Sequence, residues 1–178
     1  MTAVLPIRPP AVADAPAPGR EARFVPLTAA RLDAVLATEQ RVYSHPWTRG
    51  NFSDTLAAGH LAQCLLGSAA EGDEELLGYF VAMPGYREVH LLNITVAPAH
   101  QRQGWALVML DALVLWARRQ QAEWLWLEVR ASNVRAQQVY LRRGFNRVGL
   151  RKGYYPAPHG AREDAVVMSL RLDAAQPL

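Results

Sequence analysis

The sequence predicts a single α/β domain whose sheet mixes parallel and antiparallel strands. Short strand-like segments alternate with amphipathic helical segments, in the order β-α-α-β-β-β-α-β-α-β-β. About half of the 178 residues are apolar (51%), enough for the chain to bury a core of its own. No apolar run approaches the roughly 20 residues of a membrane helix, so we expect no membrane insertion.

We expect this domain to span residues 22–173, between two tails. Residues 1–21 are rich in proline and alanine, and they lack the basic start and unbroken apolar run of a secretory signal. They are therefore predicted to form a disordered tail. Residues 174–178 are expected to form a short C-terminal tail.

In the N-terminal half, a strand at residues 22–27 is followed by a helix for which Thr28 is the expected N-cap. The apolar face of this helix consists of Leu32, Val35, Leu36 and Val42. Thr48 is expected to cap a second, short helix that ends near Gly59. Three strands are then predicted, at residues 61–66, 76–83 and 88–96.

In the C-terminal half, an amphipathic helix is predicted to begin at Gly104. Its apolar face consists of Leu107, Leu110, Leu113, Val114 and Ala117. A strand follows at residues 123–130, and the next helix is expected to start near Asn133 and to end at Gly144. The last two strands are predicted at residues 145–152 and 164–172.

Composition excludes several classes of function. Cys64 is the only cysteine, so there is no internal disulfide or cysteine metal cluster, and we expect a small buried residue in a cytoplasmic protein. The five histidines are scattered, which argues against any metal site. The net charge of +3 includes no block of like charges, so we expect no direct nucleic-acid binding. The oligomeric state stays open.

The stretch Gln-Arg-Gln-Gly-Trp-Ala at residues 101–106 separates a strand from a helix. Free backbone N–H groups and the positive end of the helix dipole make such a turn suitable for phosphate groups. The stretch lacks the G-x-G-x-x-G and Gly-Lys-Ser/Thr patterns of nucleotide-binding loops. By spacing alone, it is either a diphosphate cradle or a structural loop.

Two residues in the C-terminal half carry candidate acid–base chemistry. Glu128 shares one face of an alternating strand with Trp124, Trp126 and Arg130. It is either paired with Arg130 or another arginine, or a general base made effective by desolvation. Tyr140 on the following helix is either a core tyrosine or a proton donor, because a phenol with a pKa of about 10 stays protonated at neutral pH.

The motifs together resemble the GNAT N-acetyltransferases. They are Thr38-Glu-Gln-Arg41, Pro46-Trp47, Leu92-Asn-Ile-Thr-Val96, Gln101-Arg-Gln-Gly104, Leu125-Trp-Leu-Glu-Val-Arg-Ala-Ser-Asn133, Tyr140 with Arg143-Gly-Phe-Asn146, Tyr154-Tyr-Pro156 and Arg162-Glu-Asp-Ala165. Within that superfamily, the chain is most similar to the RimI type, whose members acetylate the N-terminal alanine of a small-subunit ribosomal protein. The resemblance covers residues 22–172 and implies a mostly antiparallel central sheet flanked by helices.

The resemblance implies acetyl-coenzyme A as co-substrate, with Glu128 as base and Tyr140 as acid. It places the acetyl and pantetheine groups on backbone of Ile94, Thr95 and Val96, with Asn133 also touching the pantetheine. The pyrophosphate would lie on the turn formed by Arg102, Gln103, Gly104, Trp105, Ala106 and Leu107. This chain departs from the family at Ala106, which replaces a common second glycine, and at Trp105, which is bulkier than the usual aliphatic residue.

Two other functions stay open at this stage. The fold and cofactor are also compatible with other protein N-termini, or a small amine, as acceptor. A non-catalytic acyl-coenzyme A binding module is the alternative from another class. The presence of both Glu128 and Tyr140 argues against such a module, because it needs no matched acid and base.

Overall fold

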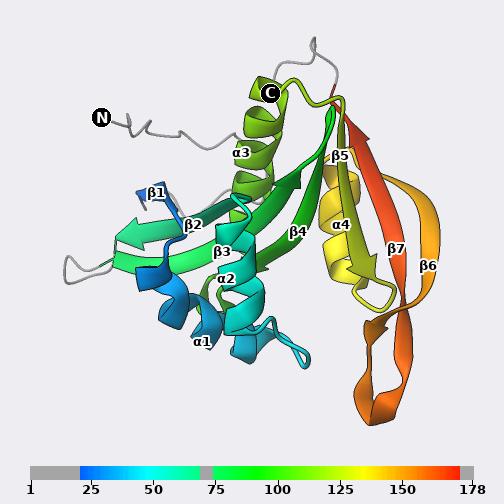
Figure 1. The fold of residues 1–178 in the computed structure, drawn as a ribbon, viewed down its shortest axis with the longest axis horizontal. Helices are drawn as coiled ribbons and strands as arrows, with labels where there is room; N and C mark the ends of the chain where they lie inside the picture. The colour runs from blue at the N-terminus through cyan, green and yellow to red at the C-terminus, as the bar shows by residue number, and fades with distance from the viewer. Residues whose placement is uncertain (1–20, 69–73, 173–178) are drawn as a thin grey trace. The chain divides into compact units, whose positions relative to one another are not determined.

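A computed structural model of the protein describes residues 21–68 and 74–172 (Figure 1). Apart from Glu21, the tails predicted at residues 1–21 and 174–178 lie outside the described residues. Seven strands form one mixed sheet in the order β1-β2-β3-β4-β5-β7-β6. The order of helices and strands along the chain is the predicted one, which confirms the α/β fold class.

The strands are β1 (Ala22–Pro26), β2 (Leu61–Ser68), β3 (Glu74–Pro84), β4 (Glu88–Val96), β5 (Trp124–Arg130), β6 (Asn146–Pro156) and β7 (Arg162–Arg171). The helices are α1 (Leu32–Val42), α2 (Arg49–Ala57), α3 (Trp105–Arg119) and α4 (Val134–Arg142). The largest difference from prediction is the end of β6, which continues through the Tyr-Tyr-Pro motif instead of stopping at Lys152. No described helix combines the length and apolar character needed to cross a membrane.

The internal contacts of the chain define two units. Unit 1 consists of Met1–Val81 and Asn93–Met109, and unit 2 consists of Ala82–Leu92 and Leu110–Leu178.

Unit 1 has a core between α1, α2 and the strands β1 to β3. The buried side chains of this core are Val25, Leu27, Leu32, Val35, Phe52, Ala62, Cys64, Leu66, Tyr79 and Val81. Cys64 is fully buried, as predicted, and burial raises the pKa of its thiol to about 11. This thiol therefore stays protonated at neutral pH.

The two predicted caps in unit 1 have different outcomes. Thr48 caps α2 as expected: its hydroxyl accepts from the Asn51 N–H while the Asn51 side chain accepts from the Thr48 N–H. The prediction for Thr28 is wrong in detail. Its side chain makes no cap hydrogen bond, because a 3-10 turn at Ala29–Arg31 precedes α1.

Unit 2 contains the parallel strand pair of the sheet. β5 pairs in parallel with β4 from Glu88↔Trp124 to Leu91↔Leu127, and on its other side it pairs antiparallel with β7. The predicted alternation of β5 is confirmed by its burial: Leu125, Leu127 and Val129 are buried. Asn133 begins α4 by accepting a hydrogen bond from the Ala136 N–H at 3.0 Å.

Candidate active site

At the end of β4, the backbone polar groups of alternate residues point away from β3. Ala97 donates its N–H to the Leu77 carbonyl of β3 at 2.9 Å. Because backbone polar groups alternate sides along an extended strand, those of Ile94 and Val96 point toward the opposite edge. These two residues belong to the predicted acyl-binding segment, and their orientation suits a ligand that adds to the strand.

Close packing fixes this segment on its β3 side. A Cβ atom at Gly78 of β3 would lie 2.5 Å from the Thr95 carbonyl oxygen and 2.9 Å from the Met109 Cε. Only glycine permits the two backbones to approach so closely. The Thr95 carbonyl is thus held against β3.

Two side chains of unit 1 already donate to the outward-facing carbonyls. The Tyr43 hydroxyl, just after α1, donates to the Ile94 oxygen at 3.2 Å and contacts Thr95 Oγ1 at 3.0 Å. The Gln101 amide donates to the Val96 oxygen at 3.4 Å. Polar groups therefore gather at the carbonyls where the family resemblance places the acyl and pantetheine groups.

The predicted cradle is a strained turn at the start of a long helix. Arg102 has φ +64° and Gly104 has φ +82°, and α3 begins at Trp105. Arg102 is exposed, and Gln103 bonds back to the Ala99 carbonyl at 3.2 Å. A left-handed turn that opens into a helix N-terminus, beside an arginine, fits a diphosphate.

The Trp105 side chain, which is bulkier than the aliphatic residue usual at this position, points inward. It is only 3% exposed, and the indole N–H donates to Gln103 Oε1 at 3.1 Å. The bulky ring is therefore part of the interior of unit 1. Leu107 donates its N–H to the Gly104 carbonyl at 3.0 Å, so the N–H groups left to a ligand precede it in the turn.

Glu128 forms an ion pair, but its partner is Arg151 of β6. The guanidinium lies 2.8 Å from Glu128 Oε1 and is placed over the Tyr154 ring at 4.3 Å. The alternative partner considered from the sequence, Arg130, pairs instead with Glu163 at 3.0 Å. The Glu128 side chain is 21% exposed, so solvent reaches this carboxylate.

The other predicted residues of unit 2 lie on and around α4. Tyr140 is buried and packs its ring against Phe145, with centroids 5.8 Å apart. Asn133 uses its side-chain oxygen as the α4 cap. Glu128, Asn133 and Tyr140 are thus all in unit 2, whereas the predicted acyl-binding segment and the predicted cradle are in unit 1.

Unit 1 contains a buried carboxylate that was not predicted from the sequence. Glu39 of α1 is 1% exposed, and it accepts hydrogen bonds from the Tyr79 hydroxyl and the Trp47 N–H. The Asn93 amide of β4 also donates to it, at 3.2 and 3.4 Å. The signal was its position: four residues after Val35, Glu39 lies on the apolar face of α1.

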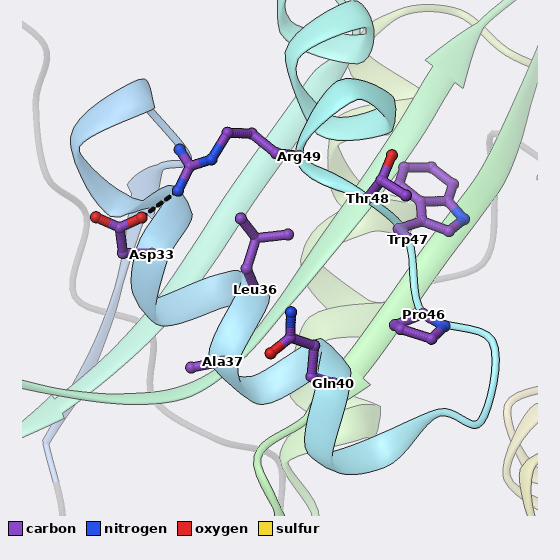
Figure 2. A pocket seen from close by; sticks show the side chains of 8 residues that line it. All are labelled: Asp33, Leu36, Ala37, Gln40, Pro46, Trp47, Thr48 and Arg49. Carbon is purple, nitrogen blue, oxygen red and sulfur yellow. Dashed lines mark hydrogen bonds and ion pairs between the residues drawn. The ribbon is translucent and has the colours of Figure 1, made fainter.

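A hollow of about 530 Å³ lies between α1 and the start of α2 (Figure 2). It is lined by Asp33, Leu36, Ala37, Gln40, Pro46, Trp47, Thr48 and Arg49. An ion pair between Arg49 and Asp33 joins the two helices at its edge. None of the predicted catalytic or cofactor-binding residues lines this hollow.

Nothing in the described ranges resembles a metal centre. No group of three or more His, Cys, Asp and Glu side chains is gathered there. His100, next to the cradle, is buried and lies 2.6 Å from Glu75. This contact links the turn after β4 to β3.

The chain matches the acetyltransferase (GNAT) family over residues 32–145, and it belongs to that family. The match includes residues of both units, so the two units are parts of one GNAT domain. The protein is therefore an acyltransferase by class.

Among curated relatives, the chain is similar to the [ribosomal protein bS18]-alanine N-acetyltransferase of Haemophilus ducreyi. The two are 36% identical over 134 residues, which is 75% of this chain and 89% of the relative. The crystal structure of the ribosomal-protein-S18-alanine N-acetyltransferase from Escherichia coli has a TM-score of 0.75 and 32% identity, covering 87% of this chain and 96% of that one.

A more distant structure shares the fold alone. Arabidopsis thaliana NAA60 in complex with acetyl-CoA has a TM-score of 0.72 at 17% identity, covering 84% of this chain and 99% of that one.

Proposed function

We propose that this protein transfers the acetyl group of acetyl-coenzyme A to the α-amino group of an N-terminal alanine on a small-subunit ribosomal protein. The observation that carries the proposal is the 36% identity to a bS18-alanine N-acetyltransferase over three quarters of this chain. The geometry supports it independently, because both the cradle and the outward edge of β4 suit the cofactor that the family uses.

Acetyl-coenzyme A supplies the acetyl group as a thioester, already activated for transfer. The pyrophosphate binds the turn at Arg102 and Gly104, where the helix dipole and an arginine favour negative charge. The acetyl and pantetheine groups bind along the segment from Ile94 to Val96, as an added strand does, on the edge to which the Ile94 and Val96 backbone groups point. The Asn133 side chain contributes a further contact to the pantetheine.

Glu128 accepts a proton from the acceptor amine, directly or through a water molecule. The neutral amine attacks the thioester carbonyl carbon, the new C–N bond forms and the C–S bond breaks. Tyr140 donates its phenolic proton to the departing sulfur. The nitrogen, which carries an extra proton after the attack, releases it to solvent, and solvent reprotonates the Tyr140 phenolate. The Glu128–Arg151 pair does not prevent this role, because Arg151 is 54% exposed and solvent screens the pair.

The test of this function is intact-mass analysis of a synthetic peptide that begins with Ala, after incubation with the protein and acetyl-coenzyme A. We expect one added acetyl group, assigned to the α-amine by fragmentation. The control is the same peptide with its N-terminus already acetylated, which should gain nothing. An unmodified Ala peptide, together with acetylation of other N-termini or small amines in parallel reactions, would assign the protein a different acceptor.

The role of Tyr140 has a separate test in Tyr140→Phe. Loss of the hydroxyl should lower kcat by roughly 10²–10⁴-fold, because the leaving sulfur loses its proton donor. The dissociation constant for acetyl-coenzyme A should stay near that of the wild type. An unchanged kcat would remove Tyr140 from the mechanism.

A further inference from the structure

Glu39 is the centre of a buried hydrogen-bond network in unit 1. Its two carboxylate oxygens accept from three neutral donors: the Tyr79 hydroxyl, the Trp47 N–H and the Asn93 amide. Burial, together with the charge of Glu39 and the hydrogen bond to it, raises the pKa of Tyr79 far above its usual value. The Tyr79 hydroxyl therefore remains protonated and keeps its role as a donor.

The network continues from Glu39 to the acyl-binding end of β4. Asn93 donates to Glu39 through its amide nitrogen, and its amide oxygen accepts from the Thr95 hydroxyl at 2.9 Å. Thr95 Oγ1 contacts the Tyr43 hydroxyl at 3.0 Å, and that hydroxyl donates to the Ile94 carbonyl. The chain of contacts thus ends on the backbone that points away from β3.

Glu39 also fixes the connector between α1 and α2, residues 43–48. The Trp47 N–H donates to Glu39 Oε1 at 3.0 Å, and Tyr43 begins the same connector. The Trp47 ring packs on Phe52 of α2, with centroids 5.2 Å apart. One carboxylate thereby holds the connector and the end of β4 in a single arrangement.

We propose that Glu39 is a positioning residue for acetyl transfer, which aligns Ile94–Val96 and Tyr43 through Asn93 and Thr95. The inference rests on the proposed function, since it takes from it the binding of the acyl and pantetheine groups along this strand. A buried carboxylate with three neutral donors is costly to keep for stability alone, because an apolar side chain of similar volume satisfies a core without desolvation. The hydrogen bonds of Glu39 lead instead, through Asn93 and Thr95, to the strand end that a bound thioester would contact.

The test compares acetyl-coenzyme A binding by calorimetry in the wild type, Glu39→Gln and Tyr43→Phe, well below each melting temperature. Glu39→Gln keeps the size of the side chain but replaces one acceptor oxygen with a donor. We expect it to raise the dissociation constant for acetyl-coenzyme A by about 10-fold. Tyr43→Phe should raise it by roughly 2–5-fold, because one hydrogen bond to Ile94 is lost.

In the double variant, the dissociation constant should rise by less than the product of the two single fold-changes, because both residues act through one network. The matched control is Thr38→Val: Thr38 is also buried on α1, but its hydroxyl donates to Ala34 within the same helix. We expect its affinity to stay within about 2-fold of the wild type. In calorimetry, the fitted stoichiometry reports the folded fraction, whereas the dissociation constant reports the site.

Equal dissociation constants for Glu39→Gln and Thr38→Val would overturn the inference. If Glu39→Gln does not fold, an unchanged affinity in Tyr43→Phe overturns it as well. Binding of acetyl-coenzyme A by the wild type without acetylation of the Ala peptide would contradict only the proposed acceptor. Absence of acetyl-coenzyme A binding by the wild type would overturn both proposals.

Discussion

Glu39 in unit 1 and Glu128 in unit 2 are carboxylates within largely apolar elements, but their surroundings are opposite. Glu39 is 1% exposed and accepts from three neutral groups, one of them a backbone N–H. Glu128 is 21% exposed and faces a guanidinium that solvent also reaches. The first carboxylate is enclosed by fixed donors, whereas the second is reached by solvent.

This difference shows that the surroundings of a glutamate determine which role it suits. A residue that positions others needs fixed partners on rigid elements, and Glu39 of α1 has such partners on β3 and β4. A general base needs access and a partner that gives way. Arg151, the partner of the proposed base Glu128, lies on an exposed strand, and its own side chain is 54% exposed.

The largest effect is expected for Glu128→Gln, which removes the proposed base. We expect kcat/KM to fall by roughly 10²–10⁴-fold, with the larger losses at lower pH, where more of the amine must be deprotonated. The melting temperature should change little, because the ion pair that is lost is exposed. Steady-state kinetics and thermal denaturation of the same sample check both parts. A large fall in melting temperature with normal activity would contradict this prediction, because it would make Glu128 a stabilising residue and not a base.

The opposite pattern is expected for Glu39→Ala. The Tyr79, Trp47 and Asn93 donors would lose their acceptor in a buried place, so the free energy of unfolding should fall by roughly 2–5 kcal/mol. Urea denaturation measures this change. Thr38→Val again serves as the control, and a loss as small as that of the control would show that Glu39 is not held as described.

Gly78→Ala should have an intermediate effect. The added methyl group would meet the Thr95 carbonyl and the Met109 side chain, so β3 and β4 must shift apart locally. We expect a loss of about 1–3 kcal/mol in the free energy of unfolding. A matched change at Gly149, where a Cβ meets nothing within 4 Å, should cost less. Equal losses at the two positions would contradict the close approach of β3 and β4.

The smallest effect is expected for Glu163, a third carboxylate, which is 23% exposed. Hydrogen bonds from Ser132, and then the Arg130 charge, lower its pKa. A lowered folded-state pKa means that the stabilisation is present above about pH 4.5 and is lost as pH falls through the folded-state value. Glu163→Gln should therefore cost less than about 1 kcal/mol near pH 7, and nothing at strongly acid pH. Urea denaturation at both pH values checks this, and a cost that grows toward acid pH would contradict the assignment.

Local sequence patterns were sufficient to predict the helices and strands, because the signals that start and stop helices act over a few residues. Thr48 caps α2 as predicted, α4 starts near Asn133 as predicted, and Gly59 and Gly144 follow the helix ends with positive φ. The prediction that Thr28 caps α1 was wrong because a 3-10 turn, which the sequence did not reveal, comes before the helix. The period of two in β5 correctly predicted that Leu125, Leu127 and Val129 share one face, because side chains in a strand alternate sides.

The partners of the charged side chains followed a different rule. Arg130 is two residues from Glu128 and was a natural candidate, but it bonds to Glu163, which is 33 residues away. Glu128 bonds to Arg151 across 23 residues, and Glu39 bonds to Asn93 across 54. Such pairs depend on which strands become neighbours, and spacing along the chain carries no information about that.

The sequence by itself determined the order of the elements, the Thr48 cap, the alternation of β5 and the motifs that resemble those of an acetyltransferase. Each depends on local periodicity or on short stretches of residues, and so each can be read from one chain. The tertiary structure decided that Trp105 turns inward, that Arg151 faces the proposed base and that Glu39 is tied to the end of β4. The physical reason is that burial and pairing of polar groups are satisfied in space, by donors and acceptors that only folding brings together.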